Sequence, residues 1–192
     1  MKYVVFCGSA VGVQPEYKAE AIALGKEMAR RNIGVVYGGA KIGIMGAVAD
    51  GAMQSGGEVI GVIPHFLNAK EIAHDAITEM ISVDTMHERK AIMNKLSDGM
   101  ITLPGGIGTM EEFFEVLTWG QLGLHKKPIA ILNTNGYYDG LIALLDVMVD
   151  QGFLKATHRE MIIVDTDIMR LLDRMSTYQA PSTEQWITEE KV

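Results

Sequence analysis

Residues 100–112 read Met-Ile-Thr-Leu-Pro-Gly-Gly-Ile-Gly-Thr-Met-Glu-Glu and combine three local patterns in one short stretch. The apolar run Met100–Leu103 predicts a buried strand, because strands covered on both faces are apolar at consecutive positions. The residues from Pro104 to Thr109 predict a tight turn, since glycine accepts backbone conformations that other residues avoid. From residue 110 the apolar side chains recur at helical spacing, so the stretch predicts a strand, a turn and a helix in succession.

The same alternation of short apolar runs and helical spacing extends along the chain to about residue 176. It predicts an α/β fold of the Rossmann-like, doubly wound kind, with a mostly parallel sheet of about seven strands and helices on both faces. We expect residues 1–176 to form a single domain and residues 177–192 to form a polar tail. The expected strands are Tyr3–Cys7, Ile33–Tyr37, Glu58–Ile63, Met80–Asp84, Met100–Leu103, Pro128–Leu132 and Met161–Val164, and the expected helices lie near 15–31, 42–55, 86–97, 110–123, 137–150 and 166–176.

Bulk composition narrows the classes of protein that this chain can belong to. A net charge of −7 disfavours a general nucleic-acid binder, because the phosphate backbone repels an acidic surface. The single cysteine, Cys7, rules out a disulfide within the chain and favours a reducing compartment. We find neither a signal-peptide pattern nor an apolar stretch approaching the roughly 18 residues of a membrane span. We therefore expect a cytoplasmic protein that binds neither nucleic acid nor membranes.

Glycine-containing turns follow three of the expected strands, at residues 7–10, 37–43 and 103–109. In a doubly wound sheet these turns converge on the edge where ligands bind. Glycine lets the backbone approach an anion closely, and the N–H groups at the start of the next helix point toward it. The three turns together predict a phosphate site, although each alone is also explained as a plain tight turn. None of them matches the dinucleotide fingerprint or the P-loop, which argues against NAD and P-loop ATP chemistry.

Three carboxylates follow the third glycine turn. We expect Thr109 to cap the helix while its hydroxyl meets a phosphate oxygen, and Glu111, Glu112 and Glu115 to crowd the first two helical turns. Acids near a helix N-terminus complement the helix dipole, which is a purely structural explanation for one or two of them. Beside a phosphate, however, a carboxylate repels the ligand. We therefore predict that one of them has a chemical task, such as orienting a water or stabilising a cationic anomeric carbon.

The expected helix after residue 85 begins with an unusual pair of cations. Thr85 and Glu88 fit a capping box, which can be their whole role. Arg89 and Lys90 oppose the helix dipole at this position, which is reasonable if an anionic ligand or the three glutamates lie opposite. Arg89 shares a helical stripe with Met86, a place that could flank a purine. The alternative is a solvated charge pair.

Other residues give weaker signals. The five histidines are scattered without ligand spacing, so we expect no metal site. Met45 follows the second glycine turn and is expected to line the pocket. The long connection Pro64–Glu79 is of the kind that often forms lids. Trp119, Leu122 and Leu124 could form a dimer face, but packing within one chain explains them equally well.

These residues occur in the order found in the LOG ("lonely guy") family, the cytokinin riboside 5′-monophosphate phosphoribohydrolases often labelled lysine decarboxylase-like, which the chain resembles from about residue 2 to 176. The family motif P-G-G-x-G-T-x-x-E is intact at Pro104–Glu112. The element G-G-G-x-x-G-L-M-G corresponds to Gly38–Gly46, and M-x-x-R-K corresponds to Met86–Lys90. The segment Thr118–Gly123 resembles a further family stretch.

The resemblance implies a Rossmann-like nucleotide-binding dimer, without a cofactor, that cleaves nucleoside 5′-monophosphates into a free base and ribose 5-phosphate. By motif position, Arg89 and Glu112 would be the catalytic pair; the residues alone do not select Glu112 over Glu111. Two departures from the motif are Ala40, where the family has a third glycine, and Ile44, where it has leucine. The expected substrate-binding residues are Ser9, Gly39, Met45, Met86, Lys90, Gly105, Gly106, Gly108, Thr109, Glu111 and Glu115.

Two other functions fit parts of the same pattern. A nucleotide-binding sensor or carrier without catalysis would have the same phosphate turn. A pyridoxal-phosphate decarboxylase, which the family label suggests, needs a Schiff-base lysine, and no lysine stands out in such a setting. The sequence leaves open which base is preferred.

Overall fold

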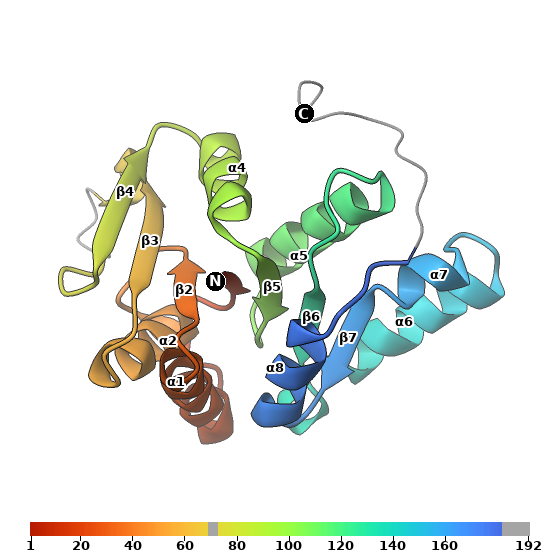
Figure 1. Cartoon of the computed structure of the whole chain (residues 1–192), viewed down its shortest axis with the longest axis horizontal. Coiled ribbons are helices and arrows are strands. Elements are labelled where there is room, and N and C mark those ends of the chain that lie inside the picture. Colours follow the sequence, from red (N-terminus) through yellow and green to blue (C-terminus); the bar gives the residue numbers. More distant parts are fainter. Residues whose placement is uncertain (69–72, 182–192) are drawn as a thin grey trace.

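Seven parallel strands form one sheet in the computed structural model, which describes residues 1–68 and 73–181 (Figure 1). The strand order is β4-β3-β2-β1-β5-β6-β7, and every neighbouring pair is parallel. The strands are β1 (Lys2–Phe6), β2 (Gly34–Tyr37), β3 (Val59–Pro64), β4 (Glu79–Val83), β5 (Gly99–Thr102), β6 (Ile129–Leu132) and β7 (Ile162–Asp165).

Helices cover both faces of this sheet, which confirms the predicted doubly wound α/β fold. Side chains of α1, α2 and α8 pack on one face, and those of α4, α5 and α6 pack on the other (Figure 1). The helices are α1 (Pro15–Arg30), α2 (Gly43–Gln54), α3 (His65–Asn68), α4 (Met86–Leu96), α5 (Ile107–Gln121), η1 (Thr134–Gly136), α6 (Asp139–Asp150), α7 (Ala156–Arg159) and α8 (Ile168–Ser176).

The strand order places the topological switch point of the sheet between β1 and β5. The chain builds the sheet outward from β1 to β4, returns through α4 to β5 beside β1, and then continues outward to β7. The helices that follow these two strands, α1 and α5, lie on opposite faces of the sheet. Ligands of doubly wound folds bind at such a switch point. The glycine turn at residues 103–109 follows β5 at this switch point.

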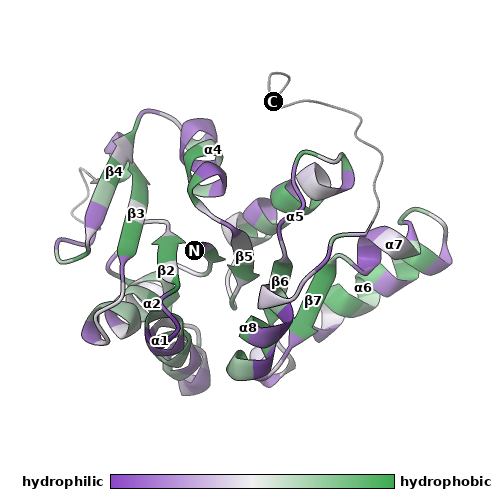
Figure 2. Ribbon diagram, in the orientation of Figure 1, coloured by the Kyte–Doolittle hydropathy of each residue, from purple (hydrophilic) through white to green (hydrophobic). Residues whose placement is uncertain are grey.

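Burial along the strands follows their position in the sheet. All residues of the inner strands β2, β5 and β6 are buried, as their mostly apolar runs predicted. The edge strand β4 exposes Glu79 and Ser82, and Figure 2 shows hydrophilic positions along it. Full burial of a large aliphatic side chain contributes about 1.5–3 kcal/mol, so the inner strands hold the core together.

The boundaries of the predicted strands agree with the structure to within one residue, and all six predicted helices are present. The main error is at α5, which begins at Ile107 rather than at residue 110. Gly106 is the N-cap of α5, so the prediction that Thr109 caps this helix was wrong. The short elements α3, η1 and α7 were not predicted, because single turns leave little periodicity.

Two predicted segments are only partly covered by the described residues. Of the expected lid Pro64–Glu79, the structure describes α3 and an antiparallel bridge between Ala73 and Ala40, while residues 69–72 lie outside the described part. Most of the expected tail, residues 182–192, also lies outside it. None of the described helices is both long and apolar enough to cross a membrane.

Candidate active site

Helix α5 determines which of the three glutamates is buried. The buried residues of α5 recur every three or four positions, the pattern of a helix packed on a sheet. Glu112 falls within this pattern and its side chain is 7% exposed, whereas the side chain of Glu111 is 52% exposed. The periodicity of the neighbouring apolar residues could therefore have selected Glu112 from the sequence. The buried residues of α5 are Thr109, Glu112, Phe113, Val116, Leu117 and Gly120.

The corrected start of α5 also weakens the structural explanation for these acids. No acidic residue lies in the first turn of α5, because Glu111 and Glu112 fall in the second turn and Glu115 in the third. The favourable effect of the helix dipole on an anion fades within the first turn. Dipole complementarity is therefore a poor reason for burying Glu112.

Helix α4, which packs on the same face of the sheet as α5, brings a cation toward Glu112. Its start is fixed by the predicted capping box: Thr85 Oγ1 accepts a hydrogen bond from the Glu88 N–H at 3.1 Å. The Glu88 carboxylate in turn accepts from the N–H of Asp84 at 3.0 Å. On its way from β4 to β5, α4 crosses β3 and β2 and turns the side chain of Arg89 inward.

Arg89 and Glu112 form a buried ion pair. Arg89 Nη1 donates to Glu112 Oε1 at 3.1 Å, and both side chains are 7% exposed. Arg89 Nε donates to the carbonyl of Val62 at the end of β3, at 2.9 Å. Gly38 leaves the space for this guanidinium, because a Cβ there would overlap Arg89 Nη2. Burying two charges is costly and adds little net stability, so such a pair indicates a functional site.

Burial strongly changes the acidity of Glu112. Loss of solvent raises the pKa of its carboxyl to about 7, and the nearby Arg89 guanidinium only partly opposes this rise. Both protonation states are therefore accessible near neutral pH, the range in which a carboxyl group can take up and return a proton. Burial also raises the pKa of the Cys7 thiol, which agrees with its predicted role as a core residue.

The second cation of α4 also contacts the glutamates, one of the two kinds of partner that its position against the helix dipole indicated. Lys90 Nζ donates to Glu111 Oε1 at 2.5 Å and to Glu115 Oε1 at 2.9 Å. The side chain of Lys90 is 8% exposed, so its charge is balanced within the protein. The structure thus brings these three predicted residues together, and their contact with substrate stays a prediction.

The turn between β5 and α5 presents unused backbone donors. The N–H groups of Ile107, Gly108 and Thr109 belong to the first turn of a helix, where the helix supplies no acceptor. Among the residues that the structure describes, none accepts a hydrogen bond from them. A Cβ at Gly106 or Gly108 would have no atom within 4 Å, so these glycines face open space. The turn therefore offers donors and room for an anion.

The same turn is packed tightly on its inner side. A Cβ at Gly105 would overlap Thr109 Oγ1 and come within 2.8 Å of the Gly8 nitrogen. The N–H of Gly8 donates to the Pro104 carbonyl at 3.1 Å, which joins the turns that follow β1 and β5. Thr109 itself is only 4% exposed. These contacts fix the shape of the turn while its outer side stays open.

The turn between β2 and α2 is built differently. The N–H groups of Ile44 and Met45, at the start of α2, donate to the Gly8 carbonyl at 3.0 and 3.3 Å. Gly39 is buried with φ +79°, and its carbonyl accepts from the N–H of His74 at 2.8 Å. The three predicted glycine turns do meet at one edge, but the donors of this one are already used by the protein.

The remaining predicted residues surround this edge. Ser9 is exposed in the turn after β1. Met45 is half-buried beside Gly38, where a Cβ would approach its Sδ to 3.0 Å, and Met86 is 38% exposed at the start of α4. Ala40, the departure from the glycine motif, is 5% exposed, so its methyl group lies inside the protein.

The sequence did not indicate three participants in the site. Gly38 was not chosen from its motif, and the carbonyl of Val62 carries no side-chain signal. Tyr137, in the loop after β6, donates from its hydroxyl to the carbonyl of Gly105 at 2.7 Å. Its position beside Tyr138, after the strand that neighbours β5, is a signal that could have been used.

Comparisons with known proteins find relatives over most of the chain. The family model described as "Possible lysine decarboxylase" matches residues 45–175. A probable cytokinin riboside 5′-monophosphate phosphoribohydrolase of Oryza sativa subsp. japonica is 45% identical over 91% of this chain and 77% of its own length. A cytokinin riboside 5′-monophosphate phosphoribohydrolase of Arabidopsis thaliana is 43% identical over 97% and 90% of the two chains.

A solved structure supports the fold at lower identity. The molybdenum cofactor binding protein of Rippkaea orientalis superposes with a TM-score of 0.70 at 19% identity, over 92% of this chain and 95% of that chain. At this identity the likeness concerns the fold alone. The identity to the plant enzymes, over 91% and 97% of this chain, shows the family as well. The chain therefore belongs to the LOG family of cytokinin riboside 5′-monophosphate phosphoribohydrolases.

Proposed function

We propose that this chain hydrolyses the N-glycosidic bond of a nucleoside 5′-monophosphate and releases the free base and ribose 5-phosphate. The observation that carries this proposal is the buried pair of Arg89 and Glu112, one helical turn beyond the open N-terminus of α5. A phosphate site and a carboxyl group with a pKa near 7 thus share one short segment of helix. Membership of the LOG family supports the same reaction.

In this proposal the 5′-phosphate is held by the N–H groups of Ile107, Gly108 and Thr109. The positive end of the helix dipole favours the phosphate charge. The open space beside Gly106 and Gly108 lets phosphate oxygens reach these donors. Holding the phosphate fixes the ribose, so that its anomeric carbon can approach the carboxyl group of Glu112.

The proposed chemical step breaks the bond between the anomeric carbon and the base nitrogen. The electron pair leaves with the base, which then takes up a proton, and positive charge develops on the ribose. Glu112 as a carboxylate stabilises this charge and accepts a proton from the attacking water. The guanidinium of Arg89 holds the carboxylate in place and favours its ionised form.

We further propose that the preferred substrates are adenosine 5′-monophosphate and its N6-modified forms, as the names of the relatives suggest. Whether the biological role is cytokinin release or nucleotide salvage depends on which of these turns over faster. A panel of nucleoside 5′-monophosphates that differ only in the base would rank them.

We also infer that residues 1–176 work as one nucleotide-binding domain in the cytoplasm. All seven described strands join one sheet, and α8 packs against the same core as α1 and α2. Tyr178, just after α8, also packs against this core.

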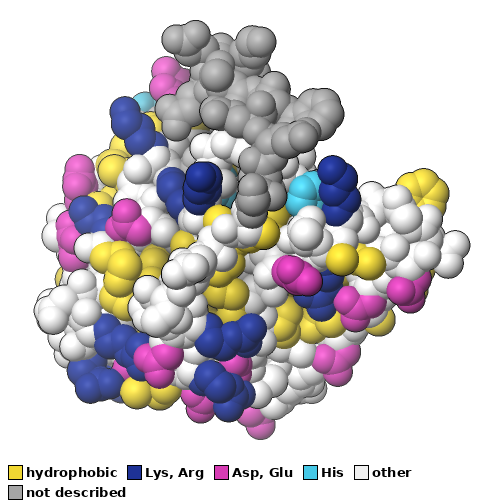
Figure 3. All heavy atoms as spheres, turned by 45° about the vertical axis from the view of Figure 1, so that its right-hand side comes forward, with side chains coloured by type: hydrophobic (Ala, Val, Ile, Leu, Met, Phe, Trp, Pro, Cys, Tyr) yellow, Lys and Arg dark blue, Asp and Glu magenta, His cyan; other side chains and the backbone are white. Residues whose placement is uncertain are grey.

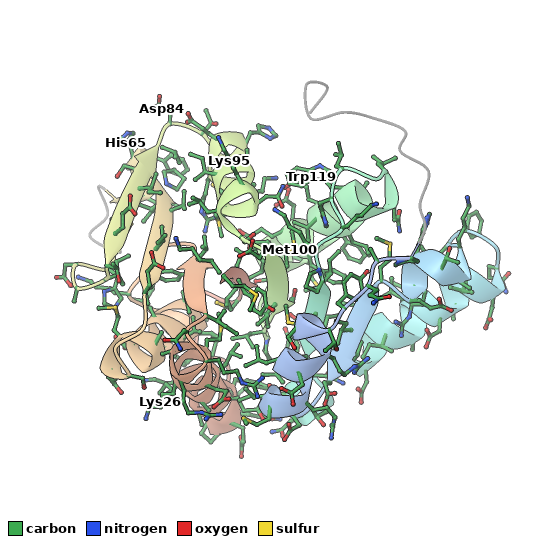
Figure 4. All side chains as sticks on the ribbon, viewed as in Figure 1. Lys26, His65, Asp84, Lys95, Met100 and Trp119 are labelled. Atoms are coloured by element: carbon green, nitrogen blue, oxygen red, sulfur yellow. The ribbon has the colours of Figure 1, made fainter. Side chains whose placement is uncertain are left out.

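A homodimer remains a prediction that the family resemblance supports. Trp119 and Leu124 line a pocket of about 390 Å³ between α4 and the end of α5, with Lys95 on its other side (Figure 4). Figure 3 shows apolar side chains among the charged ones on another view of the surface. Light scattering after size-exclusion chromatography measures the mass directly: about twice the 21.0 kDa of one chain is expected.

Base release tests the proposed reaction against a carrier or sensor function. Purified protein is incubated with adenosine 5′-monophosphate and its N6-modified forms, and free base is measured by chromatography. We expect Glu112→Gln to lower turnover at least about 100-fold, the contribution of a positioned acid or base, while nucleotide binding is kept. The matched control is Glu160→Gln, because that carboxylate is exposed and lies just after α7, outside the site.

Two results would overturn the proposal. Nucleotide binding by the wild-type protein without any release of base would favour a carrier or sensor, a function compatible with the fold of the molybdenum cofactor binding protein. Release of CO₂ from lysine, together with the visible absorbance of bound pyridoxal phosphate, would favour the decarboxylase.

A further inference from the structure

Two consecutive tyrosines bind the backbone of the glycine turn from the neighbouring loop. Tyr137 Oη donates to the carbonyl of Gly105 at 2.7 Å, and Tyr138 Oη donates to the carbonyl of Leu103 at 2.7 Å. Both tyrosines lie between η1 and α6, after the strand that pairs with β5. They act on different parts of the turn, because Leu103 ends the strand region whereas Gly105 precedes the N-cap of α5.

The bond to Gly105 fixes the orientation of one peptide group. In a trans peptide the C=O and the following N–H point in opposite directions. With its carbonyl turned toward Tyr137, the Gly105–Gly106 peptide must therefore point the Gly106 N–H away from the tyrosine. Glycine on both sides makes this peptide easy to rotate, since neither residue has a Cβ to oppose the change. If this peptide rotated by half a turn, its carbonyl oxygen would take the place of the Gly106 N–H donor.

The ring of Tyr137 is held although it is 44% exposed. It packs edge-on against Tyr17 of α1 with centroids 5.6 Å apart, and against Tyr138 at 4.8 Å. Gly12 makes room for Tyr17, because a Cβ there would come within 2.8 Å of its ring. Contacts from two sides thus keep the hydroxyl of Tyr137 aimed at the Gly105 carbonyl.

We propose that Tyr137 is a positioning residue that holds the Gly105–Gly106 peptide with its N–H turned toward the phosphate of the substrate. The inference rests on the proposed function, because it assumes that the phosphate lies at the N-terminus of α5. Tyr137 needs no contact with substrate for this role. Its hydroxyl acts by keeping a carbonyl oxygen away from the anion and a donor toward it.

Binding of ribose 5-phosphate, measured by titration calorimetry, tests this without relying on turnover. Tyr137→Phe keeps the ring and removes the hydroxyl, and we expect its Kd to rise about five- to tenfold, the value of one hydrogen bond. Tyr17→Phe is the matched control: no hydrogen bond from its hydroxyl is found within the described residues, and its Kd should match the wild type. Tyr138→Phe should lower thermal stability but change the Kd less than about twofold.

Kinetics separate positioning from a general loss of structure. For Tyr137→Phe we expect KM for the nucleotide to rise by the same factor as the Kd, with kcat within about twofold of the wild type. An unchanged Kd in Tyr137→Phe would overturn the inference, and so would an equal loss in Tyr138→Phe, which would indicate loosening of the whole turn. If the wild-type protein binds ribose 5-phosphate but releases no base, the proposed function fails while the role of Tyr137 stands.

Discussion

The glycine turns after β2 and β5 look alike in sequence but differ in what their backbone is free to do. In the turn after β2, the first N–H groups of α2 donate to the carbonyl of Gly8, and Gly43 adopts φ +68° to allow that contact. In the turn after β5, the first N–H groups of α5 have no acceptor among the described residues, and Gly106 and Gly108 face open space.

This difference shows that glycine content alone does not identify a phosphate site. A glycine can serve close packing of one backbone on another, as in the first turn, or close approach of a ligand, as in the second. The test is whether the donors at the helix start are already bonded. The pair Arg89 and Glu112 connects the two turns, because the guanidinium lies over Gly38 while the carboxylate belongs to α5.

Removing Arg89 from its ion pair with Glu112 should have the largest effect on stability. Arg89→Met leaves the buried carboxylate of Glu112 without a cation, and we expect a loss of about 3–5 kcal/mol in the free energy of unfolding above pH 7. The carboxyl has a raised pKa when folded, so its ionisation penalises the folded state as pH rises from the unfolded value of 4.5 through about 7. The loss should therefore shrink toward pH 5, as measured by urea unfolding.

The double variant Arg89→Met with Glu112→Gln is the control for that experiment. Replacing the carboxylate by a neutral amide removes the unpaired charge, so much of the lost stability should return at pH 8. An equal loss at pH 5 and pH 8 would contradict the account, because it would mean that packing, not charge, explains the effect.

A methyl group added to the first turn should have the second largest effect. In Gly43→Ala the Cβ would overlap the Ser9 backbone at a positive φ, and we expect a loss of about 2–4 kcal/mol in the free energy of unfolding. Nucleotide affinity of the protein that remains folded at low temperature should change little. A stable Gly43→Ala variant with weak substrate binding would contradict the account, because it would place the anion site at the turn after β2.

The same change in the second turn should act in the opposite way. Gly108→Ala adds a methyl group that touches no protein atom, and alanine favours a helix over glycine by up to about 1 kcal/mol. We therefore expect unchanged or slightly raised stability together with weaker binding of ribose 5-phosphate. A variant that binds as tightly as the wild type would show that the space beside Gly108 is not occupied by the ligand.

The sequence predicted the framework well because apolar burial is a local signal. The mostly apolar runs of β2, β5 and β6 placed these strands to within one residue. Position against the helix dipole indicated that Arg89 and Lys90 face either an anionic ligand or the glutamates, and the ion pairs with Glu112 and Glu111 show that they face the glutamates.

The parts that could not be predicted depend on contacts between segments far apart in the chain. Nothing near Ile44 in the sequence indicates that its N–H donates a hydrogen bond to the carbonyl of Gly8. Likewise, nothing near Gly105 indicates that its carbonyl accepts one from the hydroxyl of Tyr137. The misplaced helix start had a local cause: Thr109 is a strong capping residue, but Gly106 already provides the N-cap and Thr109 is buried. These features depend on which backbone donors and acceptors find hydrogen-bond partners, rather than on residue type.

Amide chemical shifts of the two turns test the central claim most directly. In a ¹⁵N-labelled sample titrated with ribose 5-phosphate, we expect the signals of Ile107, Gly108 and Thr109 to move together with one Kd, while those of Ile44 and Met45 stay in place. Movement of the α2 signals instead, or no movement in α5 at concentrations that saturate binding, would contradict the assignment of the phosphate site to the turn after β5.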